Sequence, residues 1–174
     1  MTGAVLAGGA SRRFGSPKTL AGGSDPLLHR PLATLRAAFG TAAVVCKPDT
    51  PLPDLPDDVP VWHDRWPQRH PLAGVLTALH HAGGRVAVLA CDMPLVSADL
   101  LRRIAGAGTG TVVAAGPEGA EPLCGVYAPG DAEALREALL AAEPLRRAIE
   151  RIGAVTVAAG GEELANINRP EQLR

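Results

Sequence analysis

A glycine-rich, basic stretch near the start of the chain, LAGGASRRFGSPK at residues 6–18, has the residue types of a phosphate-binding loop. Gly8 and Gly9 follow a short apolar run, so the backbone can turn sharply and approach a ligand closely. The N–H groups of such a turn can converge on an anion. Arg13 and Lys18 add a planar guanidinium and a mobile ammonium. We interpret this stretch as a clamp for a triphosphate.

The spacing of this stretch excludes two better-known phosphate loops. A Walker A loop reads GxxxxGK[ST], whereas here five residues separate Gly9 from Gly15 and a Ser-Pro pair stands before Lys18. A dinucleotide fingerprint needs GxGxxG, whereas the first two glycines here are adjacent. A glycine turn with solvated basic residues is the plain alternative. We favour a ligand loop because ligands of α/β sheets bind where a strand ends at a switch point.

A single acidic residue follows the central apolar run. The residues AVLACDMP at 87–94 place Asp92 just beyond a predicted strand, and therefore at the carboxyl edge of a sheet. Mg²⁺ prefers one or two carboxylates together with phosphate oxygens and water, so Asp92 is a candidate metal ligand. It would lie near the glycine turn if the two strands are neighbours. An Asp that caps the next turn is an equally ordinary interpretation.

Apolar runs bounded by turn residues alternate with segments of helical period along the chain, which is typical of stacked β-α units. Strands are predicted at residues 3–7, 42–46, 59–63, 85–90, 111–115, 121–127 and 154–158. Helices are predicted at 27–39, 72–82, 98–104 with Ser97 as N-cap, 131–142, from Pro144 onward and after Pro170. We expect an α/β fold, a three-layer α/β/α sandwich with a mostly parallel central sheet, as one domain over residues 1–174.

The composition narrows the class of protein. A chain of 174 residues with 47% hydrophobic residues can bury a substantial core, built mainly from aliphatic side chains because only 3% are aromatic. The net charge of -1 argues against a nucleic-acid partner. Cys46, Cys91 and Cys124 are odd in number and far apart, which indicates reduced thiols and no zinc site. No apolar run has the length of a membrane span, and we expect a cytoplasmic protein without a membrane partner.

Four segments, in order along the chain, resemble the signatures of the molybdenum cofactor guanylyltransferases, the MobA-like nucleotidyltransferases. LAGGASRRFGSPK at 6–18 is similar to the family's LAGGxSxRxGxxK, and HPLAG at 70–74 is similar to its GPLAG. CDMP at 91–94 resembles its CDxP, and NINRP at 166–170 resembles its terminal NxNxP. One such segment would be weak evidence, but four in the family's order make a strong case.

The resemblance implies a Rossmann-like nucleotidyltransferase fold and transfer of GMP from GTP to molybdopterin, with Mg²⁺ as cofactor. Asp92 would hold the metal, and Lys18 and Arg13 would act with it in catalysis. The residues that would contact the nucleotide are Leu6, Ala7, Gly8, Gly9, Lys18, Asp64 and Asp92. Asn166 and Asn168 would contact the acceptor or complete the metal site. The partners implied are GTP, molybdopterin and, transiently, other molybdenum cofactor proteins.

Two departures from the family pattern leave alternatives open. Cys46 stands where the family often has an Asn at the end of its second strand, which puts the identity of the base in question. His70 replaces the usual glycine before Pro-Leu-Ala-Gly and would alter the acceptor pocket. A cytidylyltransferase, or an enzyme for another phosphorylated acceptor, therefore remains an alternative. A non-catalytic carrier could dispense with Asp92 and Lys18, and their joint presence favours an enzyme.

Overall fold

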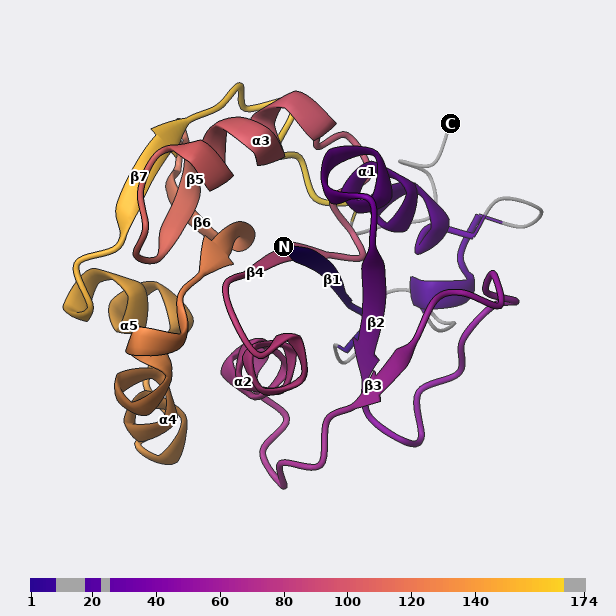
Figure 1. Cartoon of the computed structure of the whole chain (residues 1–174), viewed down its shortest axis with the longest axis horizontal. Coiled ribbons are helices and arrows are strands. Elements are labelled where there is room, and N and C mark those ends of the chain that lie inside the picture. Colours follow the sequence, from indigo (N-terminus) through magenta and orange to yellow (C-terminus); the bar gives the residue numbers. More distant parts are fainter. Residues whose placement is uncertain (9–17, 23–25, 168–174) are drawn as a thin grey trace.

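A computed structural model describes residues 1–8, 18–22 and 26–167 of the chain, and only the backbone of Lys18. The strands found there are β1 (Thr2–Leu6), β2 (Ala42–Cys46), β3 (Val61–His63), β4 (Val86–Ala90), β5 (Val112–Gly116), β6 (Gly119–Tyr127) and β7 (Val155–Ala158). They form one seven-stranded sheet in the order β3-β2-β1-β4-β6-β5-β7 (Figure 1). Among these strands β6 alone is antiparallel to its neighbours. The mostly parallel sheet is confirmed.

Helices cover both faces of this sheet. Side chains of α1 (His29–Phe39) and α3 (Ala98–Gly106) pack into the core on one face. Side chains of α2 (Pro71–Ala82), α4 (Ala132–Leu140) and α5 (Leu145–Arg151) pack into the core on the other. Two short 3-10 turns, η1 (Lys18–Leu20) and η2 (Pro129–Asp131), complete the described elements. The predicted three-layer α/β/α sandwich is confirmed (Figure 1).

The sequence explains why the central elements form where they do. All residues of β2 and β4 are buried, as their continuous apolar runs predict for parallel strands covered on both faces. Ser97 caps α3, since its Oγ accepts a hydrogen bond from the Leu100 N–H at 3.1 Å. Asp99 lies in the first turn of that helix, where its negative charge is favourable. The cap agrees with the prediction.

The predicted boundaries are wrong by a few residues at several ends. The third strand is shorter than residues 59–63, and the first helix begins at His29 rather than Leu27. The second helix begins at Pro71, because His70 serves as its cap. Asp131 belongs to η2 and not to the helix that follows. Pro144 has an extended ψ of 138°, so it precedes α5 instead of opening it. The helix predicted after Pro170 lies outside the described residues.

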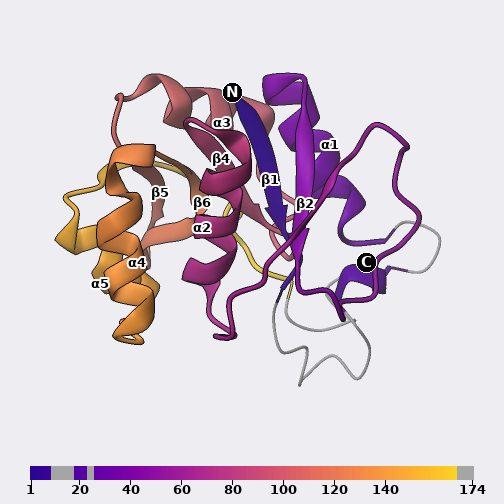
Figure 2. The ribbon, with the colours of Figure 1, turned by 60° about the horizontal axis from the view of Figure 1, so that its bottom comes forward.

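The arrangement of strands defines one functional edge. In parallel neighbours the carboxyl ends lie at the same edge of the sheet, and the arrowheads of β1 and β2 point to the same side in Figure 2. Because β6 is antiparallel to β4, its first residues lie at that same edge.

Within the described part of the chain, no helix has both the length and the apolar character needed to cross a membrane.

Candidate active site

The end of β1 lies directly beside the residue that precedes Asp92. The Cys91 N–H donates to the Leu6 carbonyl at 3.2 Å, and on the other side the Ala7 N–H donates to the Val45 carbonyl at 2.8 Å. The start of the glycine turn is therefore fixed between β2 and β4. Asp92 therefore lies close to the start of this turn, because β1 and β4 are paired neighbours.

The segment that contains Asn166 also reaches Asp92. The Ile167 N–H donates to the Asp92 carbonyl at 2.8 Å, so Asn166 and Asp92 lie at the same edge of the sheet. Both residues are half-buried. Gly8 is exposed, and a Cβ built there would meet no atom of the described residues within 4 Å. Gly8, Asp92 and Asn166 thus lie at the same edge of the sheet, and their roles in binding stay predictions.

Several predicted site residues cannot be placed beside this cluster. Gly9, Arg13 and Asn168 lie outside the described residues, and for Lys18 only the backbone, in η1, is described. Their roles in binding the triphosphate and the acceptor stay predictions.

Asp64 lies at the end of β3, and both of its carboxylate oxygens have partners. Its Oδ1 accepts from the Trp66 N–H at 2.9 Å, and its Oδ2 lies 3.0 Å from the Lys47 Nζ. The two side chains are 8% and 13% exposed. The Lys47 ammonium also donates to the carbonyls of Trp66 and Gln68. This buried ion pair fixes the loop that leads from β3 to α2.

Sequence reasoning missed Lys47. The available signal was a lysine directly after one apolar strand and an aspartate directly after the next. Its neighbour Cys46 is buried in the core on the side of α1, and burial together with the charge of Asp64 raises the pKa of its thiol. The thiol therefore takes no part in this polar network as a charged group.

The N-terminus of α2 is held against the end of β1. His70 caps the helix, because its Nδ1 accepts from the Leu72 N–H at 3.2 Å, and partial burial lowers the pKa of the imidazole. A Cβ on Gly74 would come within 3.2 Å of the Leu6 side chain, so only a glycine allows this close approach without adjustment. The positive end of the helix dipole therefore lies near the glycine turn, where it favours an anion.

A second carboxylate, which the sequence analysis did not single out, lies near Asp92. Glu121 is in the first part of β6, and burial raises the pKa of its carboxyl. The negative charge of Asp92 acts on that pKa in the same direction, whereas the Leu123 N–H and Arg146 lower it. Two acids from neighbouring strands thus share the edge, and the charge of Asp92 acts on Glu121.

The donor set at this edge fits a divalent cation bound together with a substrate. Among the described residues, no group of three His, Cys, Asp or Glu side chains gathers as a metal cage. A cation here would take protein oxygen from Asp92 and most of its ligands from phosphate and water, which is the habit of Mg²⁺. The site suits a reaction on a polyphosphate.

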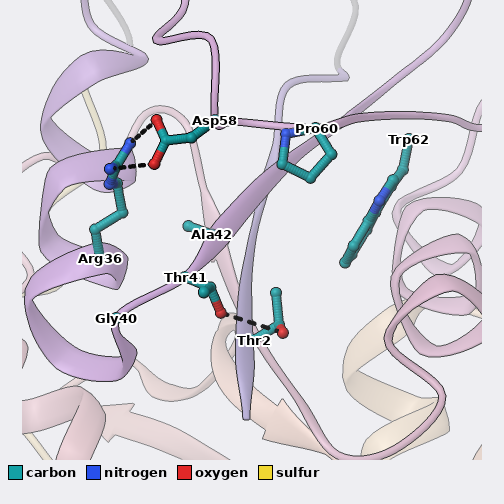
Figure 3. Close-up of a pocket in the computed structure, with 8 residues that line it drawn as sticks. All are labelled: Thr2, Arg36, Gly40, Thr41, Ala42, Asp58, Pro60 and Trp62. Carbon is teal, nitrogen blue, oxygen red and sulfur yellow. Dashed lines mark hydrogen bonds and ion pairs between the residues drawn. The ribbon is translucent and has the colours of Figure 1, made fainter.

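A shallow pocket of about 300 Å³ lies at the opposite end of the sheet (Figure 3). Its ionic groups satisfy each other, since Arg36 donates to both oxygens of Asp58 at 3.0 and 2.6 Å. Thr41 and Thr2 share a hydrogen bond at 3.3 Å across its floor. The remaining lining residues are Gly40, Ala42, Pro60 and Trp62. Among the described residues that line this pocket, the charged groups are paired with each other.

Comparison with known proteins agrees with this assignment. Residues 3–157 match the MobA-like NTP transferase domain. A probable molybdenum cofactor guanylyltransferase of Methanothermobacter thermautotrophicus is 35% identical over 192 aligned positions, which cover 98% of this chain and 96% of that protein.

Solved structures show the same architecture. The molybdopterin-guanine dinucleotide biosynthesis protein A of Archaeoglobus fulgidus superposes with a TM-score of 0.77 at 25% identity, over 99% of this chain and 95% of that one. The 2-C-methyl-D-erythritol 4-phosphate cytidylyltransferase of Thermus thermophilus shares the fold, with a TM-score of 0.69 at 21% identity over 98% and 94%. With its glycine turn and Asp92 joined at one edge, the chain belongs to the MobA-like NTP transferases and is a nucleotidyltransferase.

Proposed function

We propose that this chain transfers GMP from GTP to the terminal phosphate of molybdopterin, with Mg²⁺, and releases pyrophosphate. The observation that carries the proposal is the hydrogen bond between Leu6 and Cys91, which joins the start of the glycine turn to the residue before Asp92. The guanylyltransferase name of the relative that aligns along nearly the whole chain supports the choice of nucleotide and acceptor.

The proposed reaction is a phosphoryl displacement. An oxygen of the acceptor phosphate attacks the α-phosphorus of GTP, and the bond from that phosphorus to the bridging oxygen of pyrophosphate breaks as the new bond forms. The attacking phosphate is already anionic near neutral pH, so no strong general base is needed. In-line positioning and neutralisation of charge supply the rate enhancement.

Each predicted residue has a role in this proposal. Asp92 would hold Mg²⁺, which when bound neutralises charge on the phosphates. Lys18 and Arg13 would balance the charge of the leaving pyrophosphate. Leu6, Ala7, Gly8 and Gly9 would contact the nucleotide through their backbone, Asp64 would lie beside it with Lys47, and Asn166 and Asn168 would contact the acceptor.

A pyrophosphate-release assay with GTP, CTP, ATP and UTP, each with and without molybdopterin, tests the function. We expect release with GTP and molybdopterin together and background without the acceptor. Release with CTP and not with GTP would show that the transferred base is cytosine. The base is the part of the proposal that this outcome tests, because Cys46 stands where the family often has an Asn. Nucleotide binding without release under any combination would favour a carrier and contradict the proposal.

The role of Asp92 is tested by Asp92→Asn, with Asp57→Asn as control. Asp57 is exposed and lies on the long loop before β3. We expect Mg²⁺-dependent pyrophosphate release to fall to background in the Asp92 variant and to stay at the wild-type level in the control. Normal turnover of Asp92→Asn would remove this residue from the metal site.

A further inference from the structure

The order of strands separates the functional edge into two halves. Leu6 at the end of β1 and Asp64 at the end of β3 lie on one side of Asp92, which follows β4. The first residues of β6 lie on the other side. In an in-line displacement the nucleophile and the leaving group occupy opposite sides of the reacting phosphorus. If the glycine turn holds the pyrophosphate, the acceptor approaches from β6.

Strand β6 is deformed at this point. Val113 pairs with Gly125, but the next residue of β5, Ala114, pairs with Glu121, so residues 122–124 form a bulge in β6. The only tyrosine of the chain stabilises it, since the fully buried Tyr127 donates its hydroxyl hydrogen to the Pro122 carbonyl at 2.8 Å. Bulges beside active sites commonly redirect a side chain. Residues 122 and 123 thus separate Glu121 from residues 124–127, which pair with β4.

The Glu121 carboxylate keeps capacity to bind a ligand. Among the described residues its one hydrogen bond comes from the Leu123 N–H to Oε1 at 3.3 Å, and no cation lies within ion-pair distance of it. Arg146, whose charge lowers the pKa of Glu121, donates to the Glu118 carbonyl instead. A half-buried acid beside Asp92 repels phosphate groups. The Glu121 carboxylate instead favours a neutral part of the substrate that carries N–H donors.

We propose that Glu121 recognises the acceptor, by accepting hydrogen bonds from the pyrimidinone edge of its pterin ring. This inference rests on the proposed function. That edge presents a ring N–H and an exocyclic amino group side by side, and a carboxylate has two acceptor oxygens that can receive both. A glutamine has only one acceptor oxygen, so it loses one of the two bonds and places an NH₂ group against a donor.

The test compares Glu121→Gln and Glu121→Asp with Glu118→Gln, an exposed residue of the adjacent hairpin turn. KM for molybdopterin and kcat are measured by pyrophosphate release, Kd for GTP by calorimetry, and the Mg²⁺ concentration at half-maximal rate by titration. We expect Glu121→Gln to raise KM for molybdopterin about 10–100-fold, as loss of a hydrogen bond to a charged group does. Kd for GTP and the Mg²⁺ requirement should stay within about twofold, and Glu121→Asp should recover part of the loss.

The outcomes separate this inference from the proposed function. A wild-type protein that releases pyrophosphate with molybdopterin, combined with an unchanged KM in Glu121→Gln, overturns the inference alone. A raised Mg²⁺ requirement in that variant makes Glu121 a metal ligand and also overturns it. A wild-type protein that gives no release with molybdopterin overturns the proposed function itself. The same rise in KM in Glu118→Gln would show that the effect comes from a change in the hairpin and not from the loss of the Glu121 carboxylate. That result would also overturn the inference.

Discussion

Lys18 provides a test of the charge balance at the level of one residue. We expect Lys18→Ala to lower turnover by roughly 10²–10³, because under the proposed function it removes a preorganised donor from a charged transition state. Steady-state pyrophosphate release at saturating GTP and molybdopterin measures this loss. Lys18→Arg keeps the charge but changes its geometry, so partial activity is expected. A Lys18→Ala variant with wild-type turnover would show that this ammonium takes no part.

Some site residues could be predicted from single positions and others could not. The place of Asp92 could be predicted because it follows a wholly apolar run, which indicates the end of a buried strand. Lys47 and Glu121 were missed because their surroundings depend on partners distant in sequence. Lys47 acquires its role from Asp64 on the next strand. Glu121 reaches the edge beside Asp92 through the antiparallel direction of β6, which no local pattern fixes.

At the level of elements, the cap of α2 predicts a pH effect on stability. The Nδ1 of His70 can accept the Leu72 N–H only when it carries no proton. Burial lowers the pKa of this imidazole in the folded protein below the ordinary value of 6.5. The cap therefore contributes fully above pH 6.5, and its contribution is lost as the pH falls through the lower folded pKa. A helix cap contributes about 1 kcal/mol.

Urea unfolding at pH 7.5 and pH 5 measures this effect. His70→Asn should cap the helix without titrating in this range, so it should remove part of the loss of stability on acidification. His70→Ala should lower the free energy of unfolding by about 1 kcal/mol at pH 7.5 and by less at pH 5. Equal pH dependence of the wild type and both variants would contradict a titrating cap.

The bulge of β6 predicts a steric effect. A Cβ at Gly125 would lie 2.7 Å from the Val113 Cγ1 and 2.8 Å from the Val112 carbonyl oxygen. Gly125→Ala should therefore lower the free energy of unfolding by about 1–3 kcal/mol, as overpacking does. Gly106→Ala, at a position in α3 where a Cβ meets nothing within 4 Å, should be neutral or slightly stabilising. Similar denaturation midpoints for the two variants would contradict the tight packing at the bulge.

At the level of the whole molecule, the mostly parallel sheet and the three layers could be predicted from the alternation of apolar runs and helical segments in the sequence. The order of the strands did not, because it depends on pairing between distant segments. The reversal at β6 is the clearest case. A Gly/Pro turn between two strands was visible in the sequence, but the placement of β6 between β4 and β5 was not.

Binding should stabilise the whole fold if the site is formed before the nucleotide arrives. At a GTP concentration of one hundred times Kd, with Mg²⁺, the expected gain is about 2.7 kcal/mol. For a chain of this size each kcal/mol raises Tm by about 2–4 °C, so differential scanning fluorimetry should show a rise of roughly 5–10 °C. CTP, ATP and UTP at the same concentration should give smaller shifts. Equal shifts with all four would mean that the protein does not discriminate the base.

The rarity of aromatic residues makes the two halves of the functional edge optically distinct. Both tryptophans, Trp62 and Trp66, belong to β3 and the loop after it, and Trp66 contacts Asp64. The single tyrosine, Tyr127, lies under the bulge of β6. Tryptophan emission therefore reports on the β3 side of the sheet, and near-ultraviolet tyrosine signals report on the β6 side. Under the proposed function, nucleotide binding should therefore change the emission of Trp66, a native fluorophore that contacts Asp64.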